Sequence, residues 1–256
     1  TTNFVPQRAV LFDFCTSRGG EHPRRVLQDF EGTLVTDDYS GYHQLQRQGR
    51  IKAALCMAHA RRKLFEAHQL NGSEIAAQAV ALIAKLYEVE REAREFEPQA
   101  RLLLRQSRSR PIAQALHAWL LAQRPNLAKA DTTARAIDYS LSNWPALTRY
   151  LEDGNVPIDN NAVENAIRPL AIGRRNWLFV GSQLAGERAA VMLSLIESAK
   201  LNGHDPWAYL KDVFERLPTL KNRDLELLLP HNWKPAGVPV APAAASSYSD
   251  PNNSAP

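Results

Sequence analysis

The pattern of the chain changes at residue 73. From there to about residue 153, Ala, Leu, Glu and Arg dominate the sequence. Apolar residues recur at the spacing of one helix face, as at Val80, Ile83, Leu86 and Tyr87. Prolines interrupt the pattern at Pro98, Pro111 and Pro125. The segment 73–153 therefore predicts several consecutive helices, and because their apolar faces require burial we expect them to pack as a lobe of their own.

Strand-like patterns precede this helical block. Residues 8–14 (RAVLFDF) form a short apolar run with aromatic and β-branched members, which predicts a buried strand. A short helix is expected from Pro23 to Phe30. The sequence TLVTDDYSGY predicts a second strand, whose end delivers Asp37 and Asp38 into a turn, and IKAALCMAH predicts a third strand that runs into a helix. Strands and helices in this order indicate an α/β fold.

Helical patterns return after the block. A helix should begin near Asn161 and be ended or kinked by Pro169. The next sequence, RNWLFVGS, is typical of an extended or hairpin-like segment. A long helix is expected from about Gly186 to Leu201, and another with Asp205 as its cap. The last residues, 234–256, are rich in Pro, Ala and Ser and predict a disordered tail.

Composition restricts the class of protein. No apolar run approaches the roughly 20 residues of a membrane-spanning helix, and the N-terminal residues lack the pattern of a secretory signal. Two cysteines, Cys15 and Cys56, are too few for a disulfide framework and are consistent with a reducing cytoplasm. The net charge of +4 favours an anionic partner such as nucleic acid.

Two acids are candidates for metal chemistry. Asp37 is expected where a strand ends, and Glu164 on a helix far along the chain. Carboxylates from separate elements that meet in space are what a magnesium site on a phosphodiester requires. Each acid also has a purely structural interpretation. Aspartates favour turns, and Asn161-Ala162-Val163-Glu164 matches a capping box.

A basic segment follows Glu164. Arg168 lies four residues on and shares the Glu164 helix face. Further candidates for DNA contact come next in the chain, at Arg174, Arg175, Asn176 and Trp177. A basic segment that carries an aromatic residue fits phosphate contact plus base stacking, and a solvated loop is the alternative.

The sequence Cys56-Met57-Ala58-His59 raises the question of zinc. A structural zinc site needs four ligands, and no convincing second pair closes one. We therefore expect Cys56 to be buried and His59 to orient a neighbouring side chain. The basic run that follows, Arg61, Arg62 and Lys63, is either a solvated helix face or a phosphate contact, and the pattern does not decide between them.

Taken in order, six segments closely resemble transposases of the insertion sequence 66 family. They are LFDFCTSRGGEHP, GTLVTDDYSGYHQL, LCMAHARRKLFEA, IDNNAVENAIRPLAIGRRNWLFVGS, SLIESAKLNGHDPWAYLKDVFERLP and LLPHNW. The resemblance implies a ribonuclease H-like core with a catalytic triad of two aspartates and a glutamate. Asp37 then matches the second acid and Glu164 the third, and Cys56 and His59 match a C-x-x-H signature that supports the site.

The first aspartate of the family pattern precedes the strand that matches residues 8–14, so we expect this chain to be the C-terminal part of a transposase. Asp13 matches the third core strand instead. The resemblance implies an N-terminally truncated core in two parts, a helical insertion between them, a helical C-terminal element and a tail. The corresponding ranges are 1–72 and 154–190 for the core, 73–153, 191–233 and 234–256.

The function implied is DNA cleavage at insertion-sequence ends and strand transfer into target DNA, dependent on Mg²⁺ or, as a substitute, Mn²⁺. Expected partners are the terminal repeats, target DNA, further copies of the chain on DNA and accessory proteins of the same element, at the nucleoid in the cytoplasm. One alternative is a catalytically inactive DNA-binding or assembly fragment. Another is a metal-dependent nuclease that does not join strands.

Overall fold

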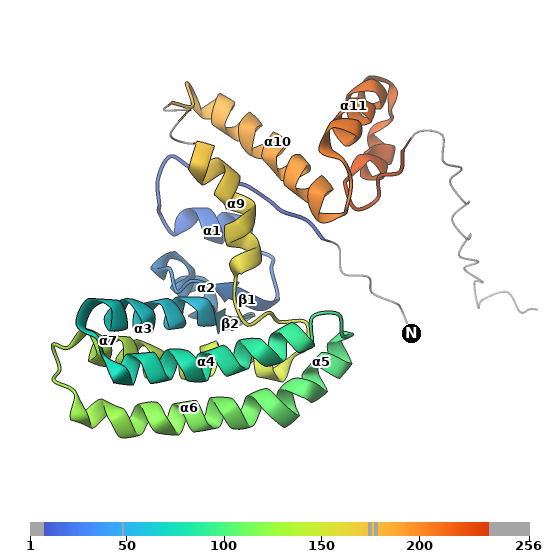
Figure 1. Cartoon of the computed structure of the whole chain (residues 1–256). Coiled ribbons are helices and arrows are strands. Elements are labelled where there is room, and N and C mark those ends of the chain that lie inside the picture. The colour runs from blue at the N-terminus through green and yellow to red at the C-terminus, as the bar shows by residue number, and fades with distance from the viewer. Residues whose placement is uncertain (1–7, 48, 174–175, 177–178, 236–256) are drawn as a thin grey trace, which may run out of the picture. The chain divides into compact units, whose positions relative to one another are not determined.

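The computed structural model describes residues 8–47, 49–173, 176 and 179–235, and is mostly helical with one small parallel sheet (Figure 1). The chain divides into two compact units. One is Cys15–Gly173, and the other combines Thr1–Phe14 with Arg174–Pro256. Within the described ranges, no helix is both long and apolar enough to cross a membrane.

The sheet lies in the unit Cys15–Gly173. Strand β1 (Gly32–Thr36) pairs in parallel with β2 (Ile51–Leu55), with Leu34 opposite Ala53. Parallel strands need a crossover connection, and here it contains the 3₁₀ turn η1 (Ser40–Tyr42) and helix α2 (His43–Arg47). Both strands were predicted from the sequence. Helix α1 (Glu21–Val26) begins before the expected helix and ends sooner.

Helix α3 (Met57–Asn71) follows β2 directly, and α4 (Glu74–Glu92) begins after the cap Ser73. Between them Gly72 adopts a left-handed φ of 65°, which ends α3 at little cost because glycine has no Cβ. The remaining elements of the helical block are α5 (Pro98–Leu104), η2 (Arg105–Ser109), α6 (Arg110–Gln123), η3 (Arg124–Asn126), α7 (Thr132–Ser142), α8 (Trp144–Leu147) and η4 (Arg149–Glu152). Residues 73–153, all of which the structure describes, contain no strand, so the prediction of a helical block is confirmed.

The helical block does not form a lobe of its own. Leu55 of β2 and Leu64 of α3 belong to the same buried cluster as Ile83, Leu116 and Ile137 of the block. A two-stranded sheet cannot bury its own apolar face. The apolar faces of the block's helices therefore pack against β2 and α3 as well as against one another. The segment boundaries drawn from the family resemblance remain predictions.

Pro111 does not break the helical path. Helix α5 passes through a π-helical turn, Arg105–Ser109, into α6. Pro111 lies in the first turn of α6, and a proline is tolerated in a first turn. The sequence signal therefore marks a change of helical pitch, and π turns of this kind often occur at functional sites.

The second unit is built on α10 (Gln183–Leu201) and α11 (Pro206–Arg216). The Asp205 carboxylate accepts a hydrogen bond from the Ala208 amide at 2.8 Å, as the predicted cap requires. The two helices share a small core, which consists of Ala199, Tyr209, Val213, Leu228 and Trp233.

The strand predicted at residues 8–14 is absent from the structure. The Val10 amide donates to the hydroxyl of Ser198 at 2.9 Å, and the Phe12 amide donates to that of Ser194 at 2.8 Å. The segment therefore lies along α10 and bonds to serine side chains where a strand would bond to a neighbouring backbone. Gly186 fits this contact, because a Cβ there would meet the Phe14 ring at 2.6 Å.

Candidate catalytic site at the strand ends

The carboxyl ends of the two strands lie side by side. Thr36 is paired with Leu55, and the Cys56 amide donates to the Thr36 carbonyl at 2.9 Å. Asp37 and Cys56 therefore leave the sheet at the same edge. The Asp37 side chain is exposed, and its Oδ1 accepts from the Tyr39 amide at 3.2 Å. The turn interpretation of Asp37 thus accounts for one of its carboxylate oxygens.

The next residue holds the chain in an unusual conformation. Asp38 has a φ of 71°, a left-handed value that no other described residue except glycine adopts. Aspartate tolerates this region better than most residues, although at some cost. The Asp38 carboxylate lies 3.2 Å from Nε2 of His43, at the start of α2. The turn after Asp37 is therefore stabilised by a side-chain contact, which the sequence did not indicate.

A distant segment reaches the same edge. The Met57 amide, in the first turn of α3, donates to the Ile158 carbonyl at 3.0 Å. Asp159 accepts from the Tyr87 hydroxyl at 2.9 Å and from the Asn161 amide at 3.1 Å. These bonds place the start of α9 (Asn161–Gly173) beside the start of α3. Because Asp159 accepts from the Asn161 amide, Glu164 does not form the capping box that the sequence allowed.

Glu164 instead contacts two basic side chains of α3. Its Oε1 lies 3.3 Å from Nε2 of His59, and its Oε2 lies 3.7 Å from a guanidinium nitrogen of Arg62. The Glu164 side chain is 37% exposed and that of His59 is 19% exposed. His59 therefore lies against a neighbouring carboxylate, and its role in orienting that carboxylate stays a prediction. The contact with Arg62 was not predicted, because the sequence indicated only that Arg62 lies on a solvated helix face or contacts a phosphate.

Cys56 contributes packing at this edge. Its side chain is fully buried, and burial raises the pKa of the thiol above its usual value, so the thiol stays protonated at neutral pH. In the parts of the chain that the structure describes, no group of three or more His, Cys, Asp and Glu side chains is arranged to hold a metal. The assignment of Asp37 and Glu164 as metal ligands therefore stays a prediction.

The burial of Cys56 gives a direct test of this packing. In a Cys15→Ser variant, the remaining thiol should not react with Ellman's reagent in native buffer at pH 8, because it is inaccessible and its pKa is raised. One thiol per chain should react after denaturation in guanidinium. Rapid reaction of the native variant would show that the edge beside Asp37 is open to solvent at Cys56.

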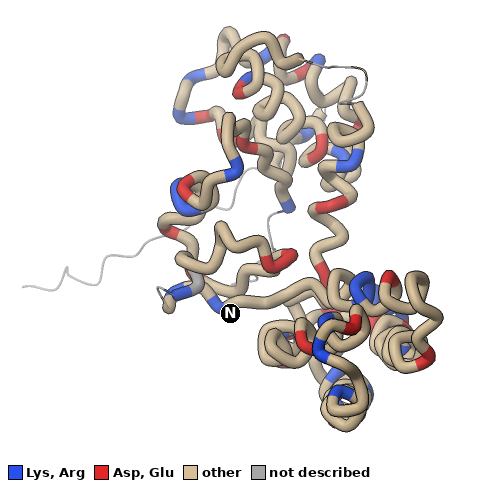
Figure 2. The backbone as a smooth tube through the Cα atoms, turned by 90° about the vertical axis from the view of Figure 1, so that its left-hand side faces the viewer, with Lys and Arg blue, Asp and Glu red and all other residues tan. Residues whose placement is uncertain are grey.

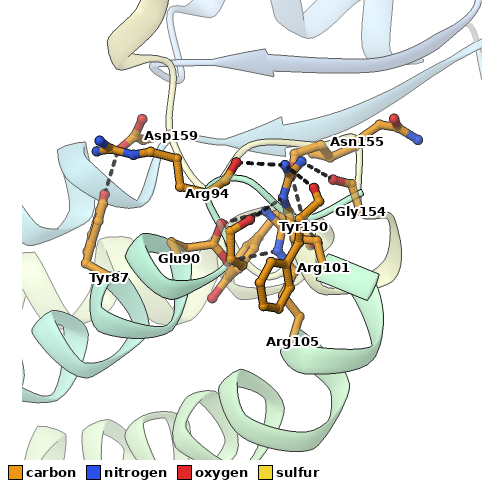
Figure 3. Close-up of polar contacts among 12 residues, drawn as sticks. Tyr87, Glu90, Arg94, Arg101, Arg105, Tyr150, Gly154, Asn155 and Asp159 are labelled. Atoms are coloured by element: carbon orange, nitrogen blue, oxygen red, sulfur yellow. Dashed lines mark hydrogen bonds and ion pairs between the residues drawn. The ribbon is translucent and has the colours of Figure 1, made fainter. Parts of the chain in front are cut away.

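Two arginines of the helical block hold the loop that leads to Asp159 (Figure 3). One guanidinium nitrogen of Arg105 donates to the carbonyls of Tyr150, Asp153 and Val156 at 2.8 to 2.9 Å. Arg101 donates to the Gly154 carbonyl at 2.9 Å. These bonds fix the path of the chain into α9. The amphipathic pattern did not reveal them, because a buried arginine and an exposed one look the same in a helical sequence.

The predicted DNA contacts are only partly described. Arg168 is exposed on α9, and Pro169 lies inside this helix without ending it. Asn176 is exposed in a turn. Arg174, Arg175 and Trp177 lie outside the described residues.

Comparison with known proteins identifies relatives over most of the chain. Residues 2–188 match the family described as Transposase IS66 family, and residues 194–231 match the IS66 C-terminal element. Two similar proteins of Sinorhizobium fredii (strain NBRC 101917 / NGR234) carry the names Uncharacterized protein y4jD and Uncharacterized protein y4hP. The first is 40% identical over 234 residues, which is 88% of this chain and 46% of the relative. The second is 37% identical over 253 residues, 93% of this chain and 46% of the relative.

The chain therefore spans about half the length of these relatives. No solved structure matches it.

Proposed function

This chain belongs to the IS66 transposase family, and we propose that it supplies the second and third acids, Asp37 and Glu164, of a site that cleaves and joins DNA. The observation that carries this proposal is the placement of Glu164. The helix that bears it begins beside α3, and two α3 side chains contact its carboxylate. Asp37 leaves the sheet next to Cys56, directly before α3. Asp37 is thus linked to the start of α3 through Cys56, and Glu164 to α3 through His59 and Arg62, although no contact among the described residues joins the two carboxylates.

The residues at this edge fit a hard divalent cation in part. Carboxylate oxygens are the ligands that Mg²⁺ prefers, and Mn²⁺ accepts them too. Two buried polar atoms nearby, Nδ1 of His59 and Oδ1 of Asn160, lack a hydrogen-bond partner among the described residues. An ion with its hydration shell could satisfy such groups. When bound, the cation would activate water for cleavage and a DNA 3′-hydroxyl for attack on the target.

The protein side chains have separate roles in this proposal. His59 and Arg62 orient the Glu164 carboxylate, as partners of metal ligands commonly do. Arg168 on the exposed side of α9 neutralises a DNA phosphate. Further contacts to phosphates and bases are proposed for the following segment, at Arg174, Arg175, Asn176 and Trp177.

We also propose that the sheet and α9 belong to a ribonuclease H-like core. The pairing of β1 with β2 through a helical crossover would be the last part of such a sheet, and α9 would be its acid-bearing helix. The first strand and first aspartate would then be contributed by the part of the relatives' length that this chain does not span. Terminal repeats, target DNA, further copies of the chain and accessory proteins of the element are the proposed partners, at the nucleoid in the cytoplasm.

Cleavage and joining by the full-length protein test this function. DNA that carries the ends of the protein's own element should be cut in Mg²⁺ or Mn²⁺ and left intact in EDTA, because the acids act through the cation. Pre-cut ends should be joined to a target plasmid under the same conditions. Cutting without joining would favour the nuclease, and binding without cutting in any divalent metal would favour the inactive fragment.

A further inference from the structure

Two adjoining pockets lie next to the start of α9. The larger has a volume of about 370 Å³, and its lining includes Tyr87 and Arg91 of α4, Arg94 in the turn after α4, and Asn161 of α9. The smaller, of about 280 Å³, shares Tyr87, Arg91 and Asn161 and adds Arg61 of α3. We call the two pockets together the arginine groove. Both lie within the unit Cys15–Gly173.

The arginines of this groove differ in what they contact. Arg101 and Arg105 line the larger pocket, but their guanidinium groups already bind backbone carbonyls and, for Arg105, Glu90 (Figure 3). Arg61, Arg91 and Arg94 are exposed, and among the described residues their guanidinium groups form no ion pair or hydrogen bond. Three exposed cationic side chains therefore line one groove.

The acids in the groove offset only part of the positive charge of these three arginines. Glu90 receives two bonds from Arg105, at 2.8 and 2.6 Å. Asp159 accepts from uncharged donors, the Tyr87 hydroxyl and Asn161, so its single negative charge remains against the three positive charges. Elsewhere basic and acidic residues are interspersed along both units (Figure 2), so the small net charge of the chain does not itself locate an anion site. The unpaired arginines of the groove do.

The groove is next to the candidate catalytic edge. Asn161, which lines both pockets, precedes Glu164 by less than one helical turn. Arg61 is adjacent in sequence to Arg62, whose guanidinium contacts Glu164. Arg91 lies in the last turn of α4, and Arg94 lies in the turn that follows the helix, where its amide donates to the Arg91 carbonyl at 3.4 Å. The groove thus presents cationic groups from α3, from the last turn of α4 and from the turn after it.

We propose that the arginine groove binds the phosphodiester backbone of DNA next to the phosphate that is cut. This inference rests on the function proposed above. It adds a second DNA-binding surface, on the helical block and α3, to the one proposed for the segment that follows Glu164. A phosphodiester backbone supplies anions in a row, which matches guanidinium groups from α3 and α4 better than one isolated anion does. Duplex and single-stranded DNA present the same chemistry, so the experiment must separate them.

The test is DNA binding by the 256-residue chain, measured by fluorescence anisotropy with labelled duplex and single-stranded oligonucleotides over a series of salt concentrations. The Arg91→Ala/Arg94→Ala double variant should bind more weakly, and its log–log salt slope should fall by about 0.9 for each lost duplex phosphate contact or about 0.7 for each lost single-strand contact. The arm with the larger loss identifies the form of DNA in the groove. Adding Arg61→Ala should lower the slope further.

Lys85→Ala/Lys129→Ala is the matched control. It also removes two exposed positive charges from this unit, at positions that line neither pocket, and should change the slope less than the arginine variant does. Arg91→Lys/Arg94→Lys should retain most of the affinity, because phosphate contact needs the charge, and circular dichroism should show that all variants are folded. Equal losses of DNA affinity in Arg91→Ala/Arg94→Ala and Lys85→Ala/Lys129→Ala would overturn the proposal that the groove binds DNA. So would the absence of DNA binding by the wild-type chain. Cleavage by the full-length protein could still succeed in either case, so the two proposals fail separately.

Discussion

Replacing Arg105 by alanine should lower the free energy of unfolding by about 3–5 kcal/mol, the usual cost of removing one partner from a buried ion pair. The Arg105 side chain is only 1% exposed, and its guanidinium binds the Glu90 carboxylate through two nitrogens. It also binds three backbone carbonyls of the loop 150–156. Without it Glu90 and these carbonyls lose their partners, and such groups are costly to leave unsatisfied in a protein interior.

Equilibrium unfolding in urea measures this effect, and the chain offers a close control. Arg108 lies on the same π turn and pairs with Glu92, but both side chains are about half exposed. Arg108→Ala should therefore cost no more than about 1 kcal/mol. Because a loss of 3–5 kcal/mol is a large part of the total stability of a domain, Arg105→Lys should be measured too, and it should fall between the two. Similar midpoints for Arg105→Ala and Arg108→Ala would show that the loop is held by other contacts.

The elements predicted correctly are those with local signals. The alternating apolar runs of β1 and β2, the helical spacing of residues 73–153 and the Asp205 cap each depend on residues close together in the sequence. The strand expected at residues 8–14 failed for the opposite reason. A short apolar run is equally compatible with a strand and with an extended segment, and what decides is a partner on α10, about 180 residues away in the chain.

The same distinction applies to the candidate site. Asp37 was predicted at a strand end and Glu164 on a helix, and His59 was expected to orient a neighbour. The sequence could not indicate that this neighbour is Glu164, because the contact joins helices separated by the whole helical block. Asp159 was missed for a similar reason. Its partner Tyr87 belongs to the apolar spacing of α4 and gives no sign that its hydroxyl reaches a carboxylate.

The contacts of Glu164 lead to the largest expected loss of activity. Changing Glu164 to glutamine in the full-length protein preserves shape but removes the charge that a metal requires. Loss of a group that only orients a metal ligand costs about 10–100-fold, so loss of the ligand's own charge should reduce cleavage at least about 100-fold. DNA affinity should change little, since phosphate contacts dominate it. Cleavage and anisotropy assays on the same preparation measure both quantities.

Two further variants separate a metal ligand from a structural carboxylate. His59→Ala removes the contact at 3.3 Å but leaves the Glu164 charge, so it should reduce cleavage by about 10–100-fold, less than Glu164→Gln does. Glu66→Gln removes one exposed acid from α3 and should leave cleavage unchanged, because no proposed contact to metal or DNA involves it. If Glu164→Gln retained wild-type cleavage, the carboxylate would serve only to join α9 to α3 through His59 and Arg62. If Glu164→Gln lost cleavage because it unfolds, its urea midpoint should fall, as we expect for Arg105→Ala. If Glu164 is a metal ligand, the variant should lose cleavage while its urea midpoint stays unchanged.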